Sequence, residues 1–213
     1  PRLQELVDLA AHVTDETKIS KIVELTRTRF ADRHILFFTE YKATQSLLMS
    51  ALIREYGNKS VTFINGDNEA RGVILNNGEI KDIKHPRENA VDDFNSGDVR
   101  FMVSTEAAGE GIDLQESCHT LIHVDLPWNP TRLEQRKGRI QRIGQVNDTV
   151  HIFNMRYKDS VEDRVHDLLS ERLRNITSIF GQLPDVLEDV WIQIAQGEIE
   201  EAKKIIDNVP DKN

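Results

Sequence analysis

A basic segment between residues 132 and 142 has the clearest potential for chemistry. Its charged residues are five cations and one acid, in the order Arg132, Glu134, Arg136, Lys137, Arg139 and Arg142. Arg139 and Arg142 are three residues apart, so on a helix they share a face. Two guanidinium groups on one face can bind a phosphate through paired hydrogen bonds. The spacing therefore indicates a phosphate-binding surface, while a solvated basic helix face would give the same charge pattern.

A second segment, residues 104–114, combines small hydroxyl residues with glycines directly after an apolar run. Its relevant members are Ser104, Thr105, Gly109, Gly111 and Asp113. Backbone N–H groups in such a turn can face an anion, and glycine allows a ligand to approach the main chain closely. An ordinary strand-to-helix turn has the same composition. The segment by itself predicts an anion site no more strongly than a plain turn.

The elements that must position these segments alternate between short apolar runs and amphipathic stretches. Strands are predicted over 34–39, 60–64, 99–103, 120–124 and 150–153, and helices over 17–31, 43–57, 86–94, 131–141 and 161–180. This alternation predicts an α/β fold with a parallel sheet flanked by helices on both faces. Ligands bind such sheets at the carboxyl ends of the strands, and both chemical segments follow strands. Residues 65–85 are expected to form a long loop.

Composition limits the class of protein. The 213 residues carry a net charge of −9, which argues against DNA binding through bulk electrostatics alone. No run approaches 18 apolar residues, so no membrane-spanning helix and no membrane partner are expected. The N-terminal residues lack the apolar stretch of a signal peptide, and Cys118 is the single cysteine. A cytoplasmic location is expected, or a nuclear one if the source is eukaryotic.

Taken together and in order, the motifs resemble the C-terminal RecA-like lobe of superfamily-two helicases, and most closely its Swi/Snf-like branch of DNA-dependent ATPases. The matching segments are 35–41, 63–67, 87–97, 103–115, 125–130 and 135–145, the last of which fits Q-x-x-G-R-x-x-R-x-G-Q at every fixed position. The resemblance covers about residues 15–165. The stretch between Gly66 and Arg87 is longer than the family pattern. We divide the chain into lead-in helices (1–32), a RecA-like lobe (33–157) and a helical extension (158–213) whose end, 185–213, is acidic.

The resemblance implies roles for individual residues. Arg139 and Arg142 would be arginine fingers that reach the γ-phosphate of ATP, and Gln135 would position the motif VI helix against the other lobe. Gly109 and Gly111 would let the backbone approach the nucleotide, and Asp113 would accept a hydrogen bond from its ribose. Thr39, Ser104 and Thr105 would contact the sugar-phosphate backbone of DNA without reading its sequence.

A phosphate loop of the form G-x-x-x-x-G-K-[ST] is absent, and so is a Walker B magnesium motif. ATP and Mg²⁺ are therefore expected to bind mainly to an N-terminal RecA-like lobe of a longer protein, and this chain alone should not hydrolyse ATP. No histidine spacing suggests a metal site here. Two alternatives stay open, an RNA helicase lobe and a non-catalytic interaction module with the same fold.

Overall fold

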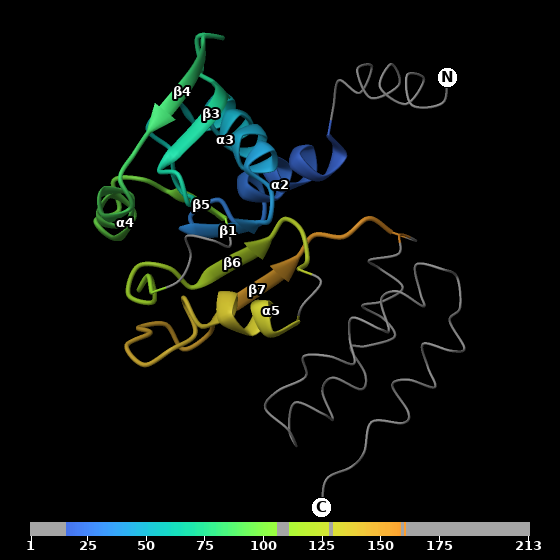
Figure 1. Ribbon diagram of the computed structural model, residues 1–213. Helices are drawn as coiled ribbons and strands as arrows, with labels where there is room; N and C mark the ends of the chain where they lie inside the picture. The colour runs from blue at the N-terminus through green and yellow to red at the C-terminus, as the bar shows by residue number, and fades with distance from the viewer. Residues whose placement is uncertain (1–15, 106–110, 128–129, 159, 161–213) are drawn as a thin grey trace, which may run out of the picture.

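Five parallel strands form the central sheet. The computed structural model describes residues 16–105, 111–127, 130–158 and 160. In these residues the sheet has the order β2-β5-β1-β6-β7, with every neighbouring pair parallel. The strands are β1 (Ile35–Thr39), β2 (Val61–Ile64), β5 (Phe101–Thr105), β6 (Thr120–His123) and β7 (His151–Asn154). Four helices connect or precede them (Figure 1): α2 (Thr17–Arg27), α3 (Lys42–Tyr56), α4 (Arg87–Asn95) and α5 (Pro130–Lys137).

The parallel sheet follows from strands that are apolar on both faces. Every residue of β1 is buried, and successive side chains point to opposite sides. Phe37 packs with α2 and α3 in one core, whereas Leu36 and Phe38 belong to a second core that includes α4. The prediction of a RecA-like parallel sheet with helices on both faces is confirmed. The predicted helical extension, 158–213, lies almost wholly outside the described residues.

The prediction of a loop over 65–85 was wrong. This stretch contains an antiparallel hairpin, β3 (Glu69–Ile74) and β4 (Ile80–Lys84). Ala70 and Val73 are buried against the α3 side of the sheet, so the hairpin contributes to the core. An Asn77-Gly78 turn between apolar runs is a hairpin signal, and Gly78 adopts a φ of 84° that favours glycine.

Helix α5 is shorter than the predicted 131–141. It ends at Lys137, and the next backbone bonds span three residues, from Arg139 N–H to the Arg136 carbonyl and from Ile140 N–H to the Lys137 carbonyl. Gly138 follows the last helical residue, and glycine lowers the stability of an α-helix at such a position. Beyond Gly138 the chain continues through the basic segment in hydrogen-bonded turns that span three residues or, from the Gln141 N–H to the Lys137 carbonyl, four residues.

Candidate functional site

A buried polar cluster lies where β1 and β6 end. The Thr39 hydroxyl donates to Asp125 Oδ2 (2.5 Å), and the Glu40 N–H donates to Asp125 Oδ1 (2.8 Å). Phe38 and His123 are register partners, which is why the two strands end side by side. From α5, Arg136 donates to the Asp125 carbonyl at 3.0 Å, and its Nη2 lies 4.0 Å from Asp125 Oδ1. One carboxylate thus joins the ends of two strands to a helix.

Burial sets the charge states in this cluster. Desolvation raises the pKa of Asp125, against the opposing effects of the Thr39 hydroxyl, the Glu40 N–H and the Arg136 cation. Burial, with Arg136 nearby, lowers the pKa of His123 to about 3. His123 is therefore neutral at pH 7, and its Nδ1, 3.4 Å from Arg136 Nη1, can accept a hydrogen bond. The cluster holds one cation and one carboxylate beside an uncharged imidazole.

A second cluster contains predicted nucleotide-binding residues. Arg142 forms an ion pair with Asp113, although the two residues are 29 positions apart. The pair is accessible, with 44% of the Arg142 side chain and 61% of the Asp113 side chain exposed. The Asn95 amide donates to the Asp113 carbonyl at 3.3 Å, which ties this segment to the end of α4. The structure thus brings the acid of the glycine-rich turn onto the basic segment.

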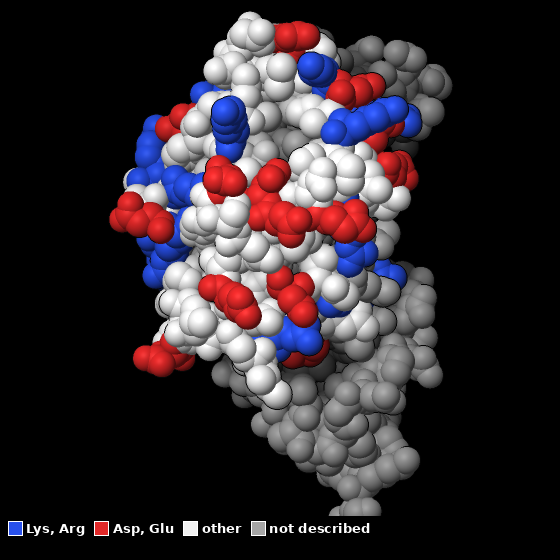
Figure 2. Space-filling view, turned by 90° about the vertical axis from the view of Figure 1, so that its left-hand side faces the viewer, with Lys and Arg blue, Asp and Glu red and all other residues white. Residues whose placement is uncertain are grey.

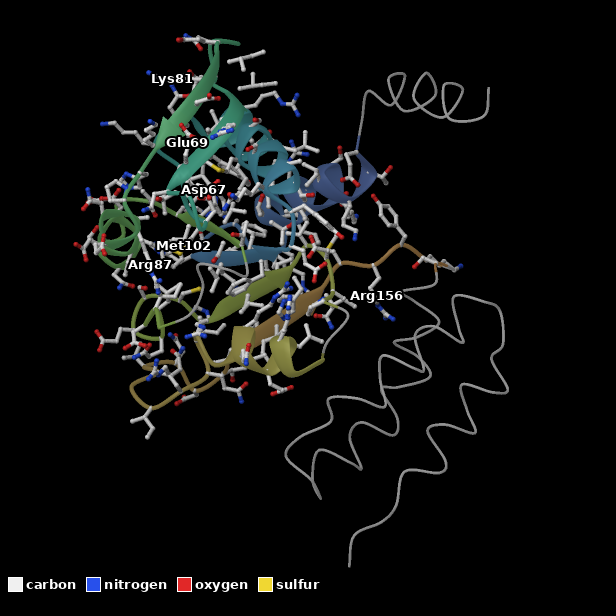
Figure 3. The ribbon with its side chains drawn as sticks, viewed as in Figure 1. Asp67, Glu69, Lys81, Arg87, Met102 and Arg156 are labelled. Atoms are coloured by element: carbon white, nitrogen blue, oxygen red, sulfur yellow. The ribbon has the colours of Figure 1, made fainter. Side chains whose placement is uncertain are left out.

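Gly111 begins the described part of the glycine-rich turn, with a φ of 73°. A Cβ at this position would lie 3.8 Å from Arg87 Nη2, so the turn passes beside the guanidinium at the start of α4 (Figure 3). A side chain would be strained at this φ, which explains the need for glycine. Arg87, which the sequence did not single out, thus adds a cation beside the turn that leads from Gly111 to Asp113.

Main-chain and amide bonds hold the turn and the basic segment together. The Leu114 N–H donates to the Arg139 carbonyl at 3.3 Å. The Gln145 side-chain amide donates to the Cys118 carbonyl (3.0 Å) and to the Ile140 carbonyl (2.9 Å). These bonds fix the backbone on both sides of Arg142. Gln145 therefore supports the cluster from within the fold.

The other predicted site residues lie outside the Arg142–Asp113 cluster. Thr39, Ser104 and Thr105 are buried, and the Ser104 hydroxyl donates to the Thr105 carbonyl at 3.2 Å. Gln135 is exposed on α5, and Gly109 lies outside the described residues. Asp125 was not among the predicted site residues, and the burial of Arg136 was not predicted. Asp125 directly follows a predicted apolar strand, and this position was the available sign that its charge would be partly buried.

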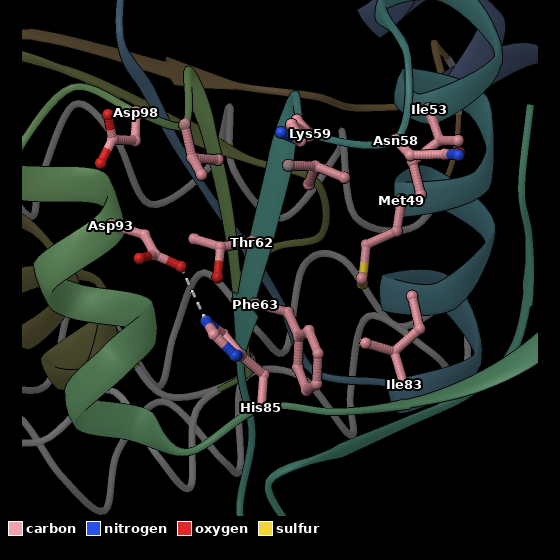
Figure 4. A pocket seen from close by; sticks show the side chains of 12 residues that line it. Met49, Ile53, Asn58, Lys59, Thr62, Phe63, Ile83, His85, Asp93 and Asp98 are labelled. Carbon is pink, nitrogen blue, oxygen red and sulfur yellow. Dashed lines mark hydrogen bonds and ion pairs between the residues drawn. The ribbon is translucent and has the colours of Figure 1, made fainter.

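The described pocket contains no residue of these clusters, whereas the charged face that carries α4 borders the second cluster through Asn95. The face of the molecule that carries α4 shows a band of acidic side chains with basic ones mainly toward its margins (Figure 2). A pocket of about 490 Å³ lies at β2 (Figure 4), with Met49 and Phe63 on its α3 side and Asp93 on its α4 side. None of the predicted site residues lines it. Among the described residues, no helix has the length and apolar character needed to cross a membrane.

Comparison with known proteins gives a family match and several relatives. The family described as "Helicase conserved C-terminal domain" matches residues 17–144. The "Uncharacterized ATP-dependent helicase YqhH" of Bacillus subtilis (strain 168) is 36% identical over 187 residues, which are 88% of this chain and 30% of that protein. The chain therefore spans less than a third of this relative.

Two solved structures have a similar fold. The C-terminal part of the Fun30 ATPase domain superposes with a TM-score of 0.57 at 22% identity, over 72% of this chain and 45% of that one. The Sulfolobus solfataricus SWI2/SNF2 ATPase core in complex with dsDNA gives 0.56 at 19% identity, over 87% and 35%. The fold is thus that of one part of these Swi2/Snf2 ATPase cores.

Proposed function

The chain belongs to the helicase conserved C-terminal domain family, and on that premise we propose that it is the second motor lobe of a Swi/Snf-like, ATP-dependent DNA translocase. In this proposal, an N-terminal RecA-like lobe of the same protein binds the triphosphate and Mg²⁺. The chain itself, as the second lobe, then contributes Arg139 and Arg142 from the opposite side of the cleft between the lobes. In this view the full-length protein hydrolyses ATP, and the chain forms one of the two sides of the nucleotide-binding site.

The observation that carries the proposal is the accessible Arg142–Asp113 pair. An exposed ion pair contributes about 0–1 kcal/mol, so a phosphate group can displace Asp113 at little cost. Arg139 lies at the same turn, and its carbonyl is fixed by Leu114. The residues present therefore fit a polyphosphate that approaches from the edge of the lobe.

Bound ATP would supply the phosphoanhydride whose hydrolysis drives movement. The guanidinium groups of Arg142 and Arg139 would neutralise the charge that develops on the transferred phosphoryl group. Asp113, released from Arg142, would accept a hydrogen bond from the ribose, and Gly111 would allow the main chain to approach. Gln135 is exposed on α5 and would face the other lobe. An arginine finger contributes roughly 10³–10⁵ in rate.

We assign DNA backbone binding to the carboxyl ends of β1 and β5. The Sulfolobus relative was solved with dsDNA, which supports duplex DNA as the partner. Thr39, Ser104 and Thr105 are buried in the described arrangement, so contacts through their hydroxyls require these strand ends to open. Contacts to phosphate and sugar alone carry no base information, so binding would be independent of sequence.

The test is steady-state ATP hydrolysis by the full-length protein, without nucleic acid and with duplex DNA, single-stranded DNA or RNA. We expect duplex DNA to stimulate the wild type and Arg142→Ala to lower kcat about 10³-fold or more. Arg142→Lys should recover little, because lysine lacks the planar fork. Arg54→Ala is the matched control, since Arg54 is an exposed arginine on α3.

Each other outcome contradicts part of the proposal. Stimulation by RNA alone would favour an RNA helicase lobe. A full-length protein that does not hydrolyse ATP would favour a non-catalytic interaction module. Wild-type kcat in Arg142→Ala would exclude Arg142 as the finger.

A further inference from the structure

Arg136 is a buried cation at the end of a short, polar helix. Its side chain is 2% exposed, while its neighbours Gln135 and Lys137 reach solvent. Its guanidinium carbon lies 5.4 Å from the centre of the Phe38 ring, a distance at which a cation and an aromatic face attract each other. A charge is withdrawn from water only where specific partners compensate it. The environment of Arg136 must therefore be built to hold it.

Two of the partners of Arg136 lie at the end of β6. Asp125 supplies its carbonyl at 3.0 Å and its carboxylate at 4.0 Å, and His123 supplies a neutral ring nitrogen at 3.4 Å. Asp125 in turn receives the Thr39 hydroxyl and the Glu40 N–H. A chain of contacts thus runs from the end of β1 through Asp125 to α5.

The position of Arg136 is passed on to the proposed arginine fingers. The Arg139 N–H donates to the Arg136 carbonyl at 3.2 Å, and the Gln141 N–H donates to the Lys137 carbonyl at 2.8 Å. The segment between Arg136 and Arg142 is therefore a run of hydrogen-bonded turns without a flexible linker. A change in where Arg136 sits would displace both fingers together.

We propose that Arg136 is a positioning residue, which fixes α5 to the ends of β1 and β6 and so sets where Arg139 and Arg142 lie. Through Asp125 and Thr39 the same contacts couple the strand end assigned to DNA to the arginine fingers. This inference rests on the proposed function of the fingers. Arg136 itself lies in the protein interior and acts through Arg139 and Arg142.

The experiment compares Arg136→Lys and Asp125→Asn in the full-length protein, with DNA-stimulated kcat and KM for ATP measured well below the melting temperature. Both changes nearly preserve side-chain size, and the first also preserves charge, but each breaks part of the contact chain. We expect kcat to fall about tenfold to 10²-fold with KM within about threefold, because a small displacement of a catalytic group slows chemistry sharply. Lys137→Met is the matched control. It removes a cation from the same helix, but that cation is partly exposed and pairs with Glu134.

A double-mutant cycle separates positioning from a general loss of stability. If Arg136 acts through Arg142, adding Arg136→Lys to Arg142→Ala should lower kcat no further, because residues that act as a unit are not additive. Additive losses, or wild-type kcat in both folded single variants, would overturn the inference. If Arg136→Lys does not fold, the same cycle with Asp125→Asn decides. Wild-type kcat in Arg142→Ala and Arg139→Ala would instead reject the proposed function itself.

Discussion

Two arginine–aspartate pairs show how neighbours set the chemistry of a residue. Asp125 and Arg136 are both ionisable groups, yet they lie largely inside the protein and hold each other there. Arg142 and Asp113 form the same kind of pair in an accessible position. The buried pair is costly to break, whereas the exposed pair can be exchanged for another anion. In the proposed function, Arg136 anchors the basic segment and Arg142 binds the phosphate.

His123 should make folding stability depend on pH. Its pKa in the folded protein is about 3, below its ordinary value of 6.5, so the unfolded chain binds more protons between these values. Stability should therefore be fully present above about pH 6.5 and decline as the pH falls toward 3. His123→Gln removes the titrating group and keeps an acceptor for Arg136. Urea unfolding at pH 7.5 and pH 4.5 should show the wild type losing about 2 kcal/mol more than His123→Gln over this interval.

Asp125 has the opposite sign and provides a check on this measurement. Its pKa is raised in the folded protein, so the folded state binds more protons than the unfolded state and Asp125 favours folding at low pH. The variant Asp125→Asn should therefore lose stability more steeply than the wild type on acidification. Equal slopes for the wild type and His123→Gln would show that His123 is protonated in the folded protein as easily as in the unfolded chain.

At the scale of elements, local pattern predicted the strands well and the helix ends less well. The apolar run 34–39 predicted β1, because a strand of a parallel sheet is covered on both faces and so is apolar at successive positions. All five residues of β1 are buried. Helix α5 ends at Lys137, four residues before the predicted end at 141. The charge pattern continues past this point, but Gly138 disfavours a continued helix. The hairpin was missed because most of its residues are polar or exposed, and only Ala70 and Val73 among them are fully buried.

The hairpin should behave as part of the core. Val73 is fully buried against the α3 side of the sheet, while Ile80 on the facing strand is 70% exposed. Val73→Ala should lower the free energy of unfolding by about 1–3 kcal/mol through lost packing and a small cavity. Ile80→Ala is the matched control and should change it by less than about 0.5 kcal/mol. Urea unfolding of both variants would contradict this placement of the hairpin if Val73→Ala were as stable as the wild type.

At the scale of the whole molecule, charge limits what this lobe can do alone. The chain carries a net charge of −9, and the face with α4 shows a band of acidic groups. If the proposed function holds, binding of a duplex should therefore depend on the N-terminal lobe of the full-length protein. Fluorescence anisotropy with a labelled 30-base-pair duplex should give a Kd for this chain weaker than about 10⁻⁶ M at 200 mM salt, the weak range of non-specific binding. Sub-micromolar binding by the chain alone would contradict this expectation.

The sequence by itself determined the α/β class and the positions of the main strands along the chain, and it led to the proposal that two segments carry the chemistry. These depend on local composition and on motif spacing, which can be read along the chain. Only the tertiary structure decided which of several arginines is buried, which acid pairs with Arg142, and that the hydroxyls of Thr39, Ser104 and Thr105 face the interior. Burial and pairing depend on residues far apart in sequence, as between Asp113 and Arg142. The same residue types at the same spacing can therefore bind a ligand or support the fold, and only their neighbours in space decide which.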